Sequence, residues 1–273
     1  NWTAEFEGNN YVIDKNDFSF VSDQGKIEFK SVFNIIHGTP GEDGKLSGYF
    51  DLIEMPYNSS GVLASSLTFN KNWGNRFLST YGIAVPQSVV FYKEEDNSAL
   101  YSEINFPCFV KPNNGGSSIG THKVYDKAAL EVALKDAFKH DTEVIVEQFI
   151  KGREFSVGII KTPEGDQVMP LTEIIVDTDF FDYKQKYSDN GATEITPADI
   201  NPELAKECQA IVKKVFKLLR LKRVARIDFI LQEGTFYLIE VNTIPGMSSK
   251  SILPQQAKYE GISFNGLIEK LAV

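Results

Sequence analysis

The chain has 273 residues, of which 42% are hydrophobic and 24% charged, and it carries a net charge of -9 with a pI near 5.0. That length and balance suit a folded protein of two or three small domains. The acidic balance argues against nucleic acid or an anionic membrane as partner, because both require a basic surface. No run of about 18 apolar residues occurs and the first residues have no signal-peptide pattern, so we expect a cytoplasmic protein without a membrane span.

Cysteine and histidine give no sign of a disulfide framework or a metal cluster. Cys108 and Cys208 stand far apart and neither belongs to a CxxC pair, which is typical of reduced thiols. His37, His122 and His140 are scattered without metal-ligand spacing.

The first half of the chain alternates between strand and helix patterns. Apolar, β-branched runs indicate buried strands, and apolar residues at helical spacing indicate amphipathic helices. The predicted elements are a strand at 27–36, a helix at 70–82, a strand at 88–92, a strand ending at Lys111 and a helix capped by Asp126.

The second half begins with strand patterns separated by short polar breaks. VIVEQFI (144–150), EFSVGIIK (154–161) and QVMPLTEII (167–175) predict a cluster of antiparallel strands. Residues 177–201 lose all periodicity, and a loop of that length inside a domain is usually functional or disordered. The remaining predictions are a helix at 203–220, a strand pair joined by Glu233-Gly234, and a helix from Pro254 that breaks near Gly261.

The stretch VKPNNGGSSIG (110–120) has the composition of a phosphate-binding loop. Its glycines allow backbone N–H groups to face an anion, its serines add donors, and Lys111 supplies a positive charge from the strand before it. It is not a Walker A loop, in which the lysine follows the glycines. From these residues alone, a glycine-rich hairpin without a ligand remains an equal alternative.

The strand pair near the C-terminus places oxygen ligands together. Glu240 and Asn242 are two apart on one strand and share a face, and Asp228 on the preceding strand can face them. Two carboxylates and an amide oxygen suit Mg²⁺ that phosphates and water complete. The alternative is an ion pair in which Arg226 neutralises Asp228, although the apolar neighbours mark these strands as interior.

Taken together, these motifs resemble the ATP-grasp superfamily and, more closely, the D-alanine–D-alanine ligase family. The resemblance implies an α/β and α+β architecture with the ATP-grasp fold in three domains. These are an incomplete N-terminal α/β domain at 1–69, a central subdomain at 70–147 and a C-terminal subdomain at 148–273 with a lid loop at 177–201. The motifs that carry the resemblance are HGTPGEDG (37–44), NK (70–71), VKPNNGGSSIG (110–120), VEQFIKGREFSVG (146–158), FFDYKQKY (180–187), RID (226–228) and EVNTIPGMSSKSILP (240–254).

The resemblance also implies a reaction and the residues that carry it. ATP would phosphorylate the carboxylate of one D-alanine, and the amine of a second would displace phosphate, with two Mg²⁺ ions that Mn²⁺ can replace. The implied ATP-binding residues are Lys71, Lys111, Ser117, Glu147, Gln148, Phe149, Ile150 and Glu154. The implied catalytic residues are Arg226, Ser118, Tyr187, Lys186 and Gly246. The implied substrate-binding residues are His37, Glu42, Ser251 and Ile252, and the implied metal ligands are Asp228, Glu240 and Asn242.

Three further expectations come from comparison with the family pattern. The chain begins past the family's first strand and its acidic glycine-rich turn, so we expect it to be a trimmed product of a longer one. Tyr187 in the lid motif favours D-alanine over D-lactate as second substrate, and the resemblance implies a homodimer. The alternatives are a D-alanine–D-lactate or L-amino-acid dipeptide ligase, and a nucleotide-binding module without turnover.

Overall fold

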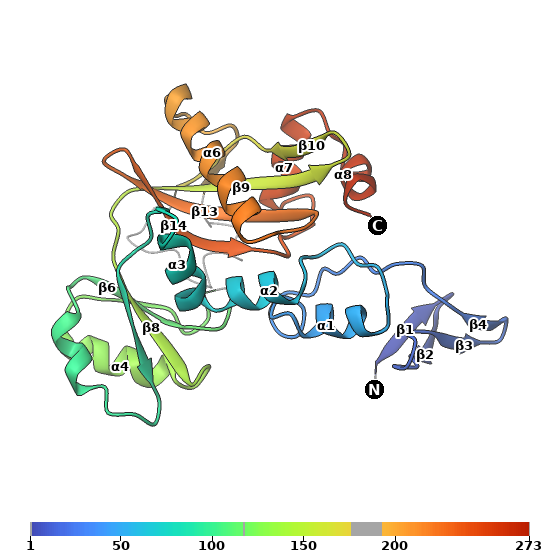
Figure 1. The fold of residues 1–273 in the computed structure, drawn as a ribbon, viewed down its shortest axis with the longest axis horizontal. Helices are drawn as coiled ribbons and strands as arrows, with labels where there is room; N and C mark the ends of the chain where they lie inside the picture. The colour runs from blue at the N-terminus through green and yellow to red at the C-terminus, as the bar shows by residue number, and fades with distance from the viewer. Residues whose placement is uncertain (1, 117, 176–192, 273) are drawn as a thin grey trace.

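The computed structural model of the chain describes residues 2–116, 118–175 and 193–272 (Figure 1). The N-terminal part contains two small antiparallel hairpins and two short helices. Within the described residues, no helix is long and apolar enough to cross a bilayer. The elements of this part are β1 (Thr3–Phe6), β2 (Asn9–Val12), β3 (Phe20–Ser22), β4 (Gly25–Ile27), α1 (Lys45–Leu52) and α2 (Val62–Phe69).

The buried strand predicted at 27–36 is wrong. β4 ends at Ile27, and beyond it only Val32 forms a single bridge, to Tyr57. Ile35 and Ile36 are 54% and 49% exposed. A β-branched run becomes a strand only where a neighbouring strand completes its hydrogen bonds, and in the part of the chain that the structure describes no strand pairs with 28–36.

A four-stranded antiparallel sheet follows, with strand order β5-β8-β6-β7. α3 begins at Asn70, whose side chain accepts a hydrogen bond from Trp73 N, and α4 begins at Asp126, whose side chain accepts from Ala129 N. α4 packs on the sheet through the apolar stripe predicted for it, and Cys108 is buried in this core. The elements are α3 (Lys71–Ser79), β5 (Ser88–Tyr92), β6 (Cys108–Pro112), β7 (His122–Val124), α4 (Lys127–Ala137) and β8 (Glu143–Gln148).

A six-stranded antiparallel sheet forms the other half, with order β12-β11-β9-β13-β14 and β10 paired to the end of β9. Phe155 and Val157 of β9 lie in one core with Cys208 of α6, whereas Ile160 lies in another with Leu253 of α7. Helices therefore cover both faces (Figure 1). The elements are β9 (Arg153–Thr162), β10 (Gly165–Val168), β11 (Thr172–Ile175), β12 (Thr193–Ile195), α6 (Pro202–Leu218), β13 (Val224–Gln232), β14 (Thr235–Asn242), α7 (Ile252–Tyr259) and α8 (Phe264–Leu271).

The predicted antiparallel cluster after residue 144 is correct only in part. β9 pairs with β10 and β11, but β8 belongs to the other sheet, so the chain passes from one sheet to the next at 149–152. Gly152 permits this passage, because a Cβ there would lie 2.1 Å from the carbonyl oxygen of Leu231. A break of three residues between two strand patterns is typical of a hairpin. The sequence pattern does not show that the chain instead continues into a second sheet.

The aperiodic segment predicted at 177–201 contains one short strand. Thr193–Ile195 form β12, which pairs with β11. Residues 177–192 lie outside the described part of the chain. The predicted turn at Glu233-Gly234 is present, with both residues at positive φ (49° and 83°), as a tight hairpin between β13 and β14 requires.

Replacing Gly152 by alanine is expected to destabilise the protein by about 1–3 kcal/mol, because the new methyl group would meet backbone that must move. Chemical denaturation would measure the loss. Gly48→Ala is the matched control: its Cβ would lie 3.5 Å from Val62, an ordinary contact, inside α1. An equal loss in both variants would contradict the crowding at Gly152.

Candidate functional site

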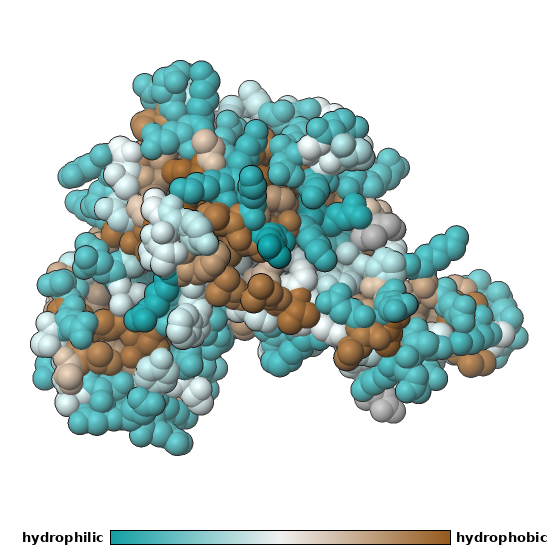
Figure 2. Space-filling model, viewed as in Figure 1, coloured by the Kyte–Doolittle hydropathy of each residue, from teal (hydrophilic) through white to brown (hydrophobic). Residues whose placement is uncertain are grey.

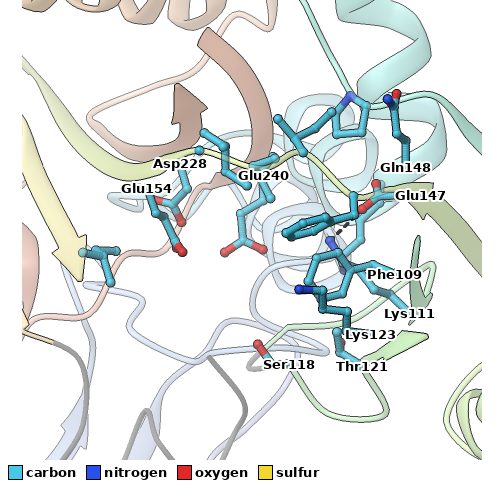
Figure 3. A pocket seen from close by; sticks show the side chains of 18 of the residues that line it. Phe109, Lys111, Ser118, Thr121, Lys123, Glu147, Gln148, Glu154, Asp228 and Glu240 are labelled. Atoms are coloured by element: carbon cyan, nitrogen blue, oxygen red, sulfur yellow. Dashed lines mark hydrogen bonds and ion pairs between the residues drawn. The ribbon is translucent and has the colours of Figure 1, made fainter. Parts of the chain in front are cut away.

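A cleft of about 620 Å³ lies between the two sheets. β6, β7, the glycine-rich loop and the segment after β8 supply one wall, and β11, β13 and β14 supply the other. Figure 3 shows acidic side chains on one side of the cleft and lysines on the other: Glu154, Asp228 and Glu240 face Lys111 and Lys123. This distribution of charge suits an anionic ligand that carries a cation.

The acidic wall follows from the register of β13 and β14. Asp228 lies opposite Glu240 and Arg226 opposite Asn242, so all four side chains share one face, as the alternation predicted. A bulge after Asp228 leaves Ile239 without a partner. The four polar side chains are thereby held at one end of the strand pair.

Arg226 and Asp228 form the ion pair that the sequence left as the alternative to a metal site. Arg226 Nη2 lies 2.7 Å from Asp228 Oδ2 and 3.4 Å from Glu240 Oε1. Burial alone would lower the pKa of the Arg226 guanidinium, but the charges of Asp228 and Glu240 outweigh burial and raise that pKa. Ser156 of β9 also donates to Asp228 Oδ1 at 2.6 Å. Among these three charged side chains the two carboxylates exceed the single guanidinium by one negative charge, and the charge of Glu240 also acts on Lys71 across the cleft.

That excess charge fits a hard divalent cation. Magnesium in phosphate-binding sites is typically held by one or two carboxylates, with phosphate and water oxygens completing the shell. Asp228 and Glu240 could supply the carboxylates, whereas Asn242 Oδ1 accepts from Ile244 N at 2.9 Å. Among the described residues, no group of three or more His, Cys, Asp or Glu side chains is placed to bind a metal.

The basic wall contains both predicted lysines. Lys111 Nζ lies 2.6 Å from Glu147 Oε2, and Lys71 Nζ donates to the carbonyl of Gly115. Burial lowers the pKa of Lys71, and the charge of Lys111 lowers it further, although nearby carboxylates oppose the shift. Two lysines that repel each other beside a glycine-rich loop form a site that an anion would stabilise.

The segment after β8 presents aromatic surface to the cleft. Phe109 and Phe149 have ring centroids 5.8 Å apart, and Lys123 Nζ lies 3.8 Å from the Phe149 centroid. Glu147 lies within two ladders, opposite Ser88 and Phe109, so its backbone belongs to the sheet and its carboxylate is the group that faces Lys111. Gln148 and Phe149 donate their N–H groups to Gln87 O and Pro107 O, and Ile150 is buried against the cleft.

Phe109 and Lys123 were not predicted from the sequence. A signal was available, because Phe109 precedes Lys111 by two residues on β6 and therefore shares its face. Lys123 lies opposite Phe109 in the β6–β7 register. Predicting Lys123 would have required the strand β7 and also its register with β6.

The N-terminal part contributes Glu42 to the same region. Its carboxylate accepts from Gly38 N, and an added Cβ on Gly116 would lie 3.8 Å from Glu42 Oε2, so the two loops are neighbours. Burial raises the pKa of Glu42, although the Gly38 bond and the charges of His37 and Arg226 oppose the shift. His37 is exposed and does not line the cleft in the described residues.

The remaining predicted residues fall into two groups. Ser118 lines the cleft at positive φ (56°), whereas Ser117, Lys186 and Tyr187 lie outside the described residues. Gly246 and Ser251 are neighbours: a Cβ on Gly246 would lie 2.7 Å from Ser251 Oγ. Ser251 precedes α7 and Ile252 is its first residue, both half-buried, so the loop after β14 brings them beside each other.

Comparison with known proteins identifies the class. Residues 77–273 match the family described as D-ala D-ala ligase C-terminus. The D-alanine–D-alanine ligase of Flavobacterium johnsoniae is 44% identical over 259 residues, covering 94% of this chain and 80% of the relative. That of Bacteroides fragilis is 39% identical, covering 98% and 83%.

Solved structures agree with the sequence comparison. VanG D-Ala:D-Ser ligase from Enterococcus faecalis superposes with a TM-score of 0.86 at 34% identity, covering 97% of this chain and 79% of that one. The Bacillus anthracis D-alanine–D-alanine ligase complexed with ATP gives 0.78 at 30% identity, covering 89% and 78%. The fold is that of an ATP-grasp ligase. Within that class, the chain belongs to the D-alanine–D-alanine ligase family.

Removing the Glu147 charge is expected to weaken ATP binding and to destabilise the folded protein. Glu147→Gln leaves the Lys111 ammonium without its carboxylate, which should cost about 1–3 kcal/mol of unfolding free energy and raise the KM for ATP. Lys206→Gln is the control, because its partner Glu203 is 81% exposed and such pairs contribute little. Unchanged ATP kinetics in Glu147→Gln would show that the pair has no part in nucleotide binding.

The raised pKa of Glu42 predicts a pH dependence with a definite sign. The folded state binds this proton more tightly than the unfolded state, whose carboxyl has its ordinary value near 4.5. Glu42 therefore contributes stability below that value and loses it as the pH rises through the folded-state pKa. Unfolding free energies from pH 4 to 7 should show wild type losing stability relative to Glu42→Gln as pH rises. A constant difference would contradict this.

Proposed function

We propose that the chain joins two D-alanine molecules in an ATP-dependent reaction that yields D-alanyl-D-alanine for peptidoglycan synthesis. One observation carries the proposal beyond family membership: Lys71 and Lys111 lie on one wall of a single cleft, and Asp228 and Glu240 on the other. A triphosphate between these walls would contact the lysines directly and the carboxylates through a divalent cation. That is the arrangement that phosphoryl transfer between two anions requires.

The first step forms an acylphosphate. A carboxylate oxygen of the donor D-alanine attacks the γ-phosphorus of ATP, and the bond from that phosphorus to the bridging oxygen breaks to release ADP. Lys71 and Lys111 hold the phosphates, and Lys186 would approach the γ-phosphate from the lid. Bound magnesium, held by Asp228, Glu240 and the proposed third ligand Asn242, would neutralise charge on the phosphate oxygens; we propose two ions, replaceable by manganese.

The second step forms the peptide bond. The acceptor amine attacks the acyl carbon, a tetrahedral oxyanion develops, and the carbon–oxygen bond to phosphate breaks as the nitrogen loses its proton. Arg226 and the N–H of Gly246 would stabilise that oxyanion, because hydrogen-bond donors aimed at developing negative charge lower the barrier. Ser251 and Ile252 would hold the acceptor's carboxylate.

The remaining residues orient the substrates. His37, Glu42, Ser118 and Tyr187 would enclose the donor amino acid, and closure of the lid would protect the acylphosphate from water. Ser117 would add a donor to the phosphates. Adenine would lie in the segment Glu147–Ile150 beside Phe109, with Glu154 on the ribose hydroxyls.

We further propose a three-domain division at 1–69, 70–147 and 148–273, and a cytoplasmic homodimer. Location in the cytoplasm follows from the need for ATP. For the dimer, exposed apolar side chains gather over α1 and α2 (Figure 2): Leu52, Val62 and Leu63 are 85%, 41% and 75% exposed. A patch of this kind is typical of a contact between subunits.

The identity of the acceptor substrate has specific alternatives. The structural neighbour from Enterococcus faecalis is described as a D-Ala:D-Ser ligase, so D-serine is a candidate beside D-alanine. D-lactate is a second candidate, because a hydroxyl and an amine are similar in size. Differences of one such group between acceptors can be strongly selective when a buried polar group would lose its partner.

The deciding experiment measures phosphate release from ATP and Mg²⁺ with D-alanine alone and with D-alanine plus D-serine, D-lactate or L-alanine. We expect D-alanine-dependent release and D-alanyl-D-alanine by mass spectrometry. Glu240→Gln and Lys111→Met should lower the rate by at least about 100-fold, whereas Lys206→Gln should not. Nucleotide binding without amino-acid-dependent release would instead favour a binding module.

A further inference from the structure

α7 connects the proposed acceptor site to the interior of the protein. It follows directly on Ser251, and its inner side packs against β9 through Leu253 and Ala257. The same side carries Gln256, whose exposed fraction is 0%. Burial of an amide is costly unless its polar atoms find partners, so this residue needs a structural explanation.

The amide of Gln256 is bonded at both ends. Its Nε2 donates to Ser156 O at 2.9 Å and to Thr172 Oγ1 at 3.0 Å, and its Oε1 accepts from Gly158 N at 3.0 Å. A glutamine in this position therefore acts as donor and acceptor towards one strand. Neither an aliphatic side chain nor a carboxylate could satisfy both groups.

These bonds fill a break in the sheet. On this side of β9, the ladder with β10 ends at Ile159 and the ladder with β11 begins at Ser156. Met169 donates to Gly158 O, but the Gly158 N–H donates to Gln256 Oε1, and Ser156, where the β11 ladder begins, also accepts from Gln256 Nε2. The side chain of α7 thus takes the place of a missing residue in the ladder.

Gly158 allows α7 to approach this closely. A Cβ there would lie 2.4 Å from Leu253 Cδ1 and 2.7 Å from Gln256 Oε1. Neither distance is tolerated between real atoms, so the helix rests directly on the backbone of β9. The position of α7 relative to β9 is consequently set both by contact and by two hydrogen bonds, and the third bond ties α7 to Thr172 of β11.

The same strand positions the acidic wall. Ser156, whose carbonyl accepts from Gln256, donates its hydroxyl to Asp228 Oδ1 at 2.6 Å. Asp228 in turn holds Arg226 at 2.7 Å. One short stretch of β9 therefore links the helix that begins at Ser251 to the groups that would stabilise the reacting phosphate and oxyanion.

We infer that Gln256 is a positioning residue that holds the acceptor-binding end of α7 in register with Arg226 and Asp228. The inference rests on the proposed function. It assigns Gln256 mainly to the second step, because Gln256 bonds the backbone of β9, whereas Asp228 keeps its own bonds to the Ser156 hydroxyl and to Arg226. Loss of this contact should misplace the acceptor amine, and a misplacement of about 1 Å can cost up to about 100-fold in rate.

The two steps can be measured separately. Hydroxylamine intercepts an acylphosphate without using the acceptor site, by attacking the acyl carbon and displacing phosphate. We expect Gln256→Met, which keeps the side-chain length but removes all three bonds, to form D-alanyl hydroxamate at close to the wild-type rate. Dipeptide formation should fall by about ten-fold or more, with a higher KM for the acceptor and an unchanged KM for ATP.

Gln209→Met is the matched control. Gln209 of α6 lies on the opposite face of the same sheet, and its Nε2 donates to Met169 O at 3.2 Å. The substitution is identical and also removes an amide bond to the backbone near β10, but it does not touch α7. It should lower the unfolding midpoint without changing the ratio of dipeptide to hydroxamate.

A second pair of variants covers the case in which Gln256→Met does not fold. Gly158→Ala should push α7 away while every hydrogen-bonding side chain remains, and it should reduce the dipeptide-to-hydroxamate ratio similarly. Adding Leu253→Ala removes the closer of the two clashes and should partly restore the ratio, even though it removes buried apolar surface. A purely structural role predicts no such recovery.

The outcomes separate this inference from the function on which it rests. If wild type forms neither hydroxamate nor dipeptide, the proposed function fails and the inference fails with it. If wild type forms both and the variants lower them equally, or leave their ratio unchanged, Gln256 contributes only to stability and the inference alone is overturned.

Discussion

The site depends on a surplus of negative charge held on one face of a buried sheet. Asp228 and Glu240 lie opposite each other on β13 and β14, and among the described residues Arg226 forms an ion pair with both. Carboxylates this close repel each other in a medium of low dielectric unless cations compensate them. The fold tolerates the arrangement because Arg226 and Ser156 bind Asp228, and the charge that remains is what would attract a metal-bound nucleotide in the proposed function.

On the opposite wall of the cleft, positive charges repel each other. Lys71 and Lys111 lie near each other, and burial disfavours the charged form of Lys71. Glu147 compensates Lys111 from the interior of the four-stranded sheet. One sheet therefore contributes a wall with excess negative charge, and the other contributes a wall with lysines. A bound magnesium–triphosphate would balance the charge of both walls. This explains why the residues that would bind it come from distant parts of the chain.

Much of this arrangement could be predicted from local patterns. The helix caps Asn70 and Asp126 are sequence signals, and the alternation in β13 and β14 placed Asp228, Glu240 and Asn242 on one face. The strand predictions failed where the outcome depends on which strand lies beside the segment. Residues 28–36 have strand composition without a strand beside them, and β8 and β9 are adjacent in the chain but not in a sheet.

The site residues also divide into those that a local pattern predicts and those that only long-range contacts bring to the cleft. The glycine-rich loop and its lysine are visible in the sequence, but the contact of Glu42 with that loop joins segments more than 70 residues apart. Phe109 and Lys123 enter the cleft through a register that no local pattern specifies. Gln256 was missed because one glutamine on a helix has no distinguishing spacing, and its importance comes from a break in the neighbouring ladder.

The two cysteines have a use that follows from where they are buried. Cys108 belongs to the core beneath α4 and Cys208 to the core beneath α6, and neither is more than 1% exposed. Burial raises the pKa of Cys108 to about 11, so its reactive thiolate is scarce in the folded protein at neutral pH. Each thiol is therefore a built-in reporter for the opening of its own half of the molecule, and the order in which they become alkylated in denaturant would reveal which half yields first.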